Sequence, residues 1–319
     1  MKKLLFAVCI VFVTAVLSAE HGTGRSDKGD LEKTPEAVLS AFLYAYPDKI
    51  TSVTRDGDDW LIEIGSTVFF WADGSFLPED LLTDKDAYTA HPFYLYPPSL
   101  PPIEEPTLEE KQRLEKWIAD REANPPTRYP GIYNALWRVA DMRTAWNQSK
   151  TAYFFGHELL IHRDLLDELA AIEEELMARA GGDRELGVYI ESLKNVEGFS
   201  WRQIADTSSL SYHSYGAAID FLPESTGGRG IYWLWKKEFD PEWYLLPYDR
   251  RHMPPNSFIE TFEKRGFIWG GKWFFYDTMH FEYRPEILAL NGWLREERTN
   301  PVTGVRETVW VAPEPQGER

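Results

Sequence analysis

Residues 211–222 read Ser-Tyr-His-Ser-Tyr-Gly-Ala-Ala-Ile-Asp-Phe-Leu, a turn signal followed by a strand signal. Gly216 permits a sharp backbone turn, and the apolar residues after it have strand character. On a strand, Ala218 and Asp220 share one face, so the Asp220 carboxylate projects beside a very small residue. His213 precedes the turn and can fold back toward that face. The stretch therefore predicts a bend with room for an ion, although a turn-capping Asp and a surface His fit it equally well.

A second stretch, residues 276–282, reads Tyr-Asp-Thr-Met-His-Phe-Glu and supplies a further imidazole. His280 follows Asp277 by three positions, which is enough to place both around one water without both binding an ion. Catalytic zinc takes three protein ligands, leaves a fourth position for water, and works with a nearby carboxylate that accepts a proton. The two stretches together contain such a set. Glu282 lies on the same strand face as His280, where it either orients the imidazole or is a surface acid.

The residues between the two stretches predict the elements that present the second one. A helix over 256–265, capped by Asn256 or Ser257, ends at Gly266. A strand from Phe267, a turn at residues 270–271 and a returning aromatic strand then lead into Asp277.

The pair of motifs resembles the zinc D-alanyl-D-alanine metallopeptidases, which share a superfamily with lysostaphin-type enzymes and hedgehog domains. Their pattern is Ser-x-His-x-x-Gly-x-Ala-x-Asp, followed further on by an acid three positions before a His. Every element has an occupant here: Ser211, His213, Gly216, Ala218, Asp220, Asp277 and His280. The resemblance covers roughly residues 188–293. It implies Zn²⁺ bound by His213, Asp220 and His280, with Asp277 as the general base.

The resemblance also implies a fold and an activity. The expected fold is α+β, with a small antiparallel sheet that carries the zinc site and helices packed against it. The expected activity is hydrolysis of peptide bonds in peptidoglycan stem peptides. Many relatives have Glu as the base, whereas Asp277 brings this chain closer to the L-alanyl-D-glutamate endopeptidases. Carboxypeptidase and endopeptidase action therefore both stay open.

Two polar residues near the first motif are candidates for contact with substrate. Arg202 precedes His213 by eleven residues, and relatives often have an Arg in this region. A fixed guanidinium suits a substrate carboxylate or a developing oxyanion, while the alternative is a surface ion pair. Ser211 either hydrogen-bonds the substrate backbone or caps its own turn.

A different class of function is also compatible with the motifs: a non-catalytic, zinc-stabilised module that binds the cell envelope. Asp277 argues against it, because a structural zinc site usually has four protein ligands and needs no additional base.

Composition restricts the partners. The formal net charge is −17, so duplex nucleic acid would be repelled. The single cysteine, Cys9, lies in the N-terminal apolar stretch, which leaves His, Asp and Glu as the available metal ligands. The many tryptophans and tyrosines predict either ordinary core packing or an aromatic cleft for an extended polar ligand.

The N-terminus predicts export. Lys2 and Lys3 precede an apolar run over 4–16, and Ser18 and Ala19 offer small residues for cleavage. The run is short for a membrane span, which needs roughly 20 residues. We therefore expect a cleaved signal peptide, no stable membrane span afterwards, and a periplasmic or secreted protein, with a retained anchor as the alternative.

Pro and Gly residues, which are typical of turns and linkers, divide the chain into regions. They are a signal peptide over 1–19, a disordered leader over 20–33, a small N-terminal accessory α/β domain over 34–95, a Pro-rich linker over 96–106, a helical region over 107–185, the zinc peptidase core over 186–295 and a loose C-terminal tail over 296–319. Within them we expect helices over 35–46, 107–122, 132–146 and 165–180, and an antiparallel meander over 50–77.

Two further patterns are assigned no metal. His157 and His162 resemble the His-Glu-x-x-His zinc helix, but the spacing is one residue too long, so on a helix they face different ways. The acidic run at residues 173–175 predicts a solvated helix face.

Overall fold

The computed structural model describes residues 34–103, 105–205 and 207–314. The predicted signal peptide and leader, and the last residues of the predicted tail, lie outside these ranges. Within these ranges, none of the helices is both long and apolar enough to span a bilayer.

The N-terminal elements are those that local signals predict. Helix α1 (Pro35–Ala45) begins where the Thr34 side chain accepts a hydrogen bond from the amide of Ala37. A four-stranded antiparallel meander follows, formed by β1 (Ile50–Asp56), β2 (Asp59–Ile64), β3 (Thr67–Ala72) and β4 (Ser75–Leu77). A 3-10 segment covers Glu79–Ala87.

The first half of the helical region corrects one prediction. Helix α2 (Leu108–Ala123) starts with the expected capping box between Thr107 and Glu110. The single helix expected over 132–146 is wrong: the chain forms α3 (Gly131–Trp137) and α4 (Met142–Gln148). Arg138 adopts the left-handed region at φ 54°, which ends α3, and the side chain of Asp141 caps α4.

The second half contains a hairpin and two helices. Strands β5 (Ser149–Phe154) and β6 (His157–His162) pair antiparallel, and α5 (Leu166–Ala180) and α6 (Arg184–Glu191) follow. His157 and His162 therefore lie on a strand rather than a helix, and His162 is buried with its Nε2 3.0 Å from the Trp137 carbonyl.

Glu175 corrects the expectation of a solvated acidic face on α5. It is 1 % exposed and pairs with four side chains, namely Arg179 at 2.8 Å, Lys264 at 3.3 Å, Asn300 at 2.9 Å and Thr261 at 3.5 Å. These partners compensate the cost of burying its charge.

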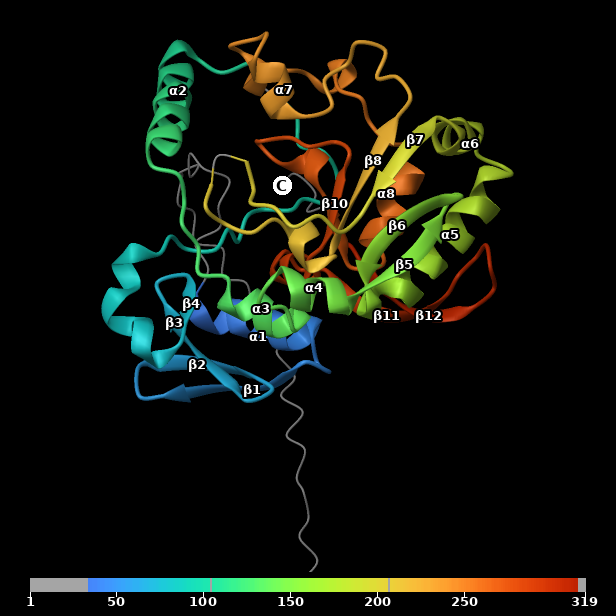
Figure 1. The fold of residues 1–319 in the computed structure, drawn as a ribbon. Helices are drawn as coiled ribbons and strands as arrows, with labels where there is room; N and C mark the ends of the chain where they lie inside the picture. The colour runs from blue at the N-terminus through green and yellow to red at the C-terminus, as the bar shows by residue number, and fades with distance from the viewer. Residues whose placement is uncertain (1–33, 104, 206, 315–319) are drawn as a thin grey trace, which may run out of the picture.

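A second four-stranded antiparallel sheet lies at the centre of the molecule (Figure 1). Its strands are β7 (Leu193–Glu197), β8 (Ala218–Pro223), β10 (His280–Tyr283) and β9 (Phe267–Trp269), in that order. Short 3-10 segments and helix α7 (Trp233–Lys237) occupy the long connection from β8 to helix α8 (Asn256–Glu263). Helices combined with small antiparallel sheets agree with the expected α+β class.

Two details around α8 differ from prediction. Pro255 occupies the N-cap position, and neither Asn256 nor Ser257 caps the helix. The prediction of an aromatic strand that leads into Asp277 is wrong. Asp277 forms an isolated β-bridge with Tyr232, and strand β10 begins only at His280.

Phenylalanines pack α8 against the face of the central sheet opposite the Asp220 side chain. Phe221 and Phe281 from the strands contact Phe258 and Phe262 from the helix, with ring centroids 4.6–5.7 Å apart. All four side chains are fully buried. Truncating one such ring typically costs about 3–5 kcal/mol, so this layer fixes the strands beneath the site.

One continuous apolar cluster joins the N-terminal elements to the central sheet. Val38 and Phe42 of α1 belong to the same buried cluster as Phe281 of β10. Helix α1 contacts α9 (Pro285–Leu290), which directly follows β10. The helix that follows β10 is therefore packed against the first helix of the described chain.

The expectation of a loose tail from residue 296 is wrong for its described part. Strands β11 (Leu294–Thr299) and β12 (Arg306–Val311) form a hairpin. Trp310 is buried, its amide donates to the Lys264 carbonyl at 2.9 Å, and its ring meets Tyr44 edge-on.

Candidate metal centre

Strand pairing places two of the expected ligands opposite each other. In the β8–β10 ladder, Asp220 is the direct partner of His280. Directly paired residues of antiparallel strands have neighbouring side chains on one face. The backbone register therefore fixes the carboxylate beside the imidazole.

The third expected ligand is brought in by a tight turn. His213 lies in a 3-10 segment (Tyr212–Tyr215) that ends at Gly216, where φ is 65°. A Cβ at Gly216 would lie 2.8 Å from the backbone nitrogen of His162, so the turn requires glycine for both conformation and space. This turn folds His213 back toward β8, as the sequence predicts.

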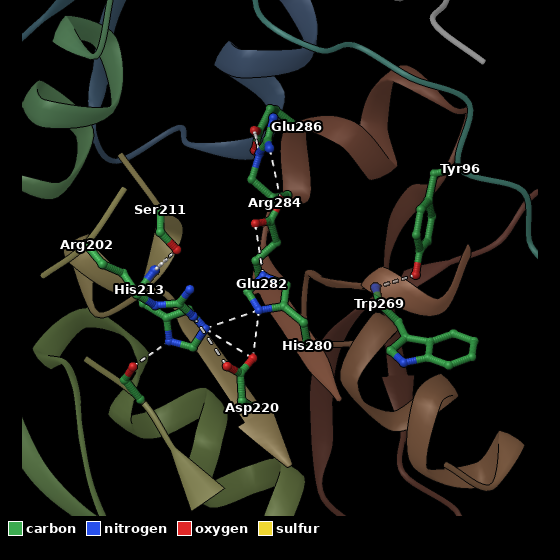
Figure 2. A network of polar contacts seen from close by, with 11 residues as sticks. Tyr96, Arg202, Ser211, His213, Asp220, Trp269, His280, Glu282, Arg284 and Glu286 are labelled. Atoms are coloured by element: carbon green, nitrogen blue, oxygen red, sulfur yellow. Dashed lines mark hydrogen bonds and ion pairs between the residues drawn. The ribbon is translucent and has the colours of Figure 1, made fainter. Parts of the chain in front are cut away.

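The ligand atoms of the three side chains converge (Figure 2). Asp220 Oδ1 lies 3.1 Å from His213 Nε2 and 2.8 Å from His280 Nδ1, and the two nitrogens are 3.2 Å apart. All three residues are buried. Within the described ranges, this is the group of His, Cys, Asp and Glu side chains that fits one metal ion.

The outer contacts of the imidazoles fix which nitrogens face inward. His213 Nδ1 lies 2.5 Å from the Gly198 carbonyl oxygen, and His280 Nε2 lies 3.3 Å from Glu282 Oε2. In their neutral forms, imidazoles that donate hydrogens to these oxygens direct the lone pairs of His213 Nε2 and His280 Nδ1 at each other and at Asp220. Two facing lone pairs and a carboxylate suit a divalent cation, so the residues fit Zn²⁺.

The charges of the site shift the pKa values of its acids in opposite directions. Burial alone would raise the pKa of Asp220, but His213 and His280 hold it well below its usual range. Burial and the nearby Asp220 charge raise the pKa of Asp277 to about 7. One carboxylate is therefore ionised as a ligand requires, and the other is suited to exchange a proton near neutral pH.

Asp277 lies at the edge of this site with a free acceptor. Its Oδ1 is buried and has no hydrogen-bond partner in the part of the chain that the structure describes. The backbone is fixed on both sides: the Asp277 amide donates to the Gly270 carbonyl at 3.0 Å, and its carbonyl accepts from the His280 amide at 3.3 Å. A buried carboxylate oxygen without a partner in a rigid segment is typical of a functional site.

Arg202 and Ser211 differ in what they offer a ligand. The Arg202 side chain is 47 % exposed, and its Nη2 lies 3.5 Å from Asp220 Oδ2. Ser211 is buried, and its Oγ accepts from the His213 amide at 3.4 Å. Ser211 therefore caps its own turn, whereas Arg202 lies at the rim of the site.

Residues that sequence reasoning missed lie behind His280. The sequence flagged Glu282 but neither Arg284 nor Glu286, which continue the row along β10 into α9 (Figure 2). The available signal was the alternation of charged residues at 280, 282 and 284 on one face of an otherwise apolar strand. The Gly198 carbonyl carried no side-chain signal.

Two buried imidazoles, one buried carboxylate and an adjacent unpartnered carboxylate oxygen form the kind of group that metal-dependent hydrolases use. Comparison with known families agrees: residues 205–283 match the family described as D-alanyl-D-alanine carboxypeptidase. This match contains both motifs and confirms their resemblance. The segment that carries the site therefore matches the family that its two motifs resemble, and peptidases of that family are in general zinc-dependent.

A separate match covers residues 38–93, which resemble a domain of unknown function. No curated protein and no solved structure matches the chain.

Proposed function

We propose that this protein is a zinc metallopeptidase that hydrolyses peptide bonds in peptidoglycan stem peptides. The observation that carries the proposal is the convergence of His213, Asp220 and His280 beside an unpartnered Asp277 oxygen, within a segment that matches a peptidase family. The predicted export signal agrees with this substrate, because cell-wall peptides lie outside the cytoplasmic membrane.

His213, Asp220 and His280 would hold the ion. Zn²⁺, when bound, supplies a Lewis acid that polarises the scissile carbonyl and lowers the pKa of a water molecule to about 7. Glu282 and the Gly198 carbonyl keep the two imidazoles in the tautomers that binding requires.

Asp277 moves the proton. Its Oδ1 accepts a proton from the attacking water and later returns it to the amine of the leaving group. A pKa of about 7 suits both transfers, because the acid and the base form are then both populated near neutral pH.

Arg202 binds charge on the substrate. Its half-exposed guanidinium reaches the site without being buried in it. It stabilises either a terminal carboxylate, as carboxypeptidase action requires, or the oxyanion that develops at the scissile carbonyl. The first role fits carboxypeptidase action, whereas the second serves either of the two bond choices that the sequence leaves open.

Two variants distinguish the role of the general base from that of a metal ligand. Asp277→Asn should keep zinc but reduce hydrolysis of defined muropeptides by about 10²-fold or more, because only the proton acceptor is lost. His280→Ala should lose both zinc and hydrolysis. Zinc content by atomic spectroscopy and product masses by mass spectrometry give both readouts.

The product masses also decide which bond is cut, since loss of a terminal D-alanine differs from cleavage within the stem. A zinc-loaded wild type that leaves every stem peptide intact would exclude the peptidase and favour the zinc-stabilised envelope-binding module.

A further inference from the structure

A row of buried charges leads away from the metal centre. Behind His280, Glu282 Oε1 accepts from Arg284 Nη1 at 3.1 Å, and Arg284 Nε donates to Glu286 Oε1. His280, Glu282 and Arg284 are each under a tenth exposed, and Glu286 is fully buried. Figure 2 shows these side chains in sequence along β10 and into α9. Each member of the row is therefore in direct polar contact with the next.

The far end of the row is held by two tyrosines from outside the matched peptidase segment. The Tyr46 hydroxyl, just after α1, donates to Glu286 Oε2 at 2.7 Å. The Tyr133 hydroxyl, on α3, lies 3.3 Å from Glu286 Oε1 and accepts from Arg284 Nη2 at 3.0 Å. Both tyrosines are at most 5 % exposed. An unbroken path of hydrogen bonds and ion pairs therefore connects the N-terminal part of the chain to His280.

A second contact connects the row to the other imidazole. The Arg284 guanidinium stacks over the ring of Tyr212, 4.6 Å from its centroid, and Tyr212 directly precedes His213. Arg284 thus braces the segments that carry both histidines. Buried charges of this kind are held in one arrangement, because leaving any of them unpaired is costly.

We propose that Tyr46 and Glu286 are positioning residues of the metal centre, through which α1 and the N-terminal region set the orientation of His280. The inference rests on the proposed zinc site and extends it to residues that the family match does not include. Removing the hydrogen-bond partner of a metal ligand typically weakens metal binding by about 10–100-fold. A residue further along the row acts with a smaller factor.

The chain offers a matched control in Tyr96. Like Tyr46, it is a buried tyrosine that precedes the matched segment and donates its hydroxyl to a buried glutamate, in this case Glu263. Glu263 pairs with Lys272, and neither of them contacts a metal-ligand side chain among the interactions described. Tyr46→Phe and Tyr96→Phe therefore each remove a buried hydroxyl that donates to a buried glutamate; the Tyr96 hydroxyl in addition accepts from the Trp269 amide at 2.7 Å.

The test measures the zinc affinity of the full chain by competition with a chromophoric chelator. We expect Tyr46→Phe to weaken zinc binding by roughly three- to tenfold and Glu282→Gln by about tenfold or more, whereas Tyr96→Phe retains wild-type affinity. The cobalt-substituted protein gives an independent readout, because a reoriented His280 shifts the visible absorption of Co²⁺.

The outcomes are distinct. Equal affinities for Tyr46→Phe and Tyr96→Phe, with wild type binding zinc, would overturn the positioning role and leave the peptidase proposal intact. A wild type that binds no zinc would overturn the metal centre itself. If circular dichroism shows that Tyr46→Phe does not fold, Tyr133→Phe removes the neighbouring hydroxyl of the same row and replaces it in the comparison.

Discussion

At the residue scale, His280 is a buried side chain whose pKa is shifted by two neighbouring carboxylates. Burial lowers its pKa, but the carboxylates of Asp220 and Glu282 outweigh burial and raise the pKa to about 10. In the ion-free protein the imidazole is therefore charged at neutral pH. The charge stabilises the fold fully below the unfolded pKa of about 6.5, and this contribution is lost as pH rises through 10.

Zinc must displace that proton, which makes metal affinity depend on pH. We expect the affinity to rise by about tenfold per pH unit between pH 6 and 9, as for the release of one proton. Calorimetric titrations in buffers of different ionisation enthalpy measure the protons released. A binding enthalpy that is the same in every buffer would contradict the charged state of His280.

At the element scale, the sequence predicted the helix starts and the turn that depend on neighbouring residues. Thr34 and the capping box at Thr107 identified the starts of α1 and α2, and the His213–Gly216–Asp220 spacing identified the bend before β8. The break at Arg138 was missed because nothing in its residue type signals a left-handed conformation.

The turn before β8 makes a second prediction. Gly216→Ala places a Cβ against the backbone of His162 in a left-handed conformation, and should lower the free energy of unfolding by at least about 2 kcal/mol and weaken zinc binding. Gly57→Ala is the control: its φ is also positive, at 62°, but a Cβ there meets nothing within 4 Å. It should cost only about 1 kcal/mol and leave zinc affinity unchanged.

Urea denaturation of both glycine variants provides the comparison. If Gly216→Ala is no less stable than Gly57→Ala and binds zinc as wild type does, the turn does not hold His213 in the way described.

At the scale of the whole molecule, the two motifs predicted that His213, Asp220 and His280 meet, but no sequence signal showed the other contacts between distant segments. The hairpin of β11 and β12 looked like a polar tail, because its order depends on contacts with residues such as Lys264 and Tyr44 that are remote in the chain. The burial of Glu175 depends likewise on Lys264 and Asn300. The joining of α1 to α9 through one apolar cluster, and of Tyr46 to Glu286, is of the same kind.

The central claim concerns one ion and an open coordination position, and diffraction at the zinc absorption edge tests it most directly. Crystals grown with zinc should show one strong anomalous peak about 2.0–2.2 Å from His213 Nε2, His280 Nδ1 and an Asp220 carboxylate oxygen, with Asp277 outside the ligand set. No peak between these side chains, or a peak at which Asp277 serves as a fourth protein ligand, would contradict a catalytic zinc centre.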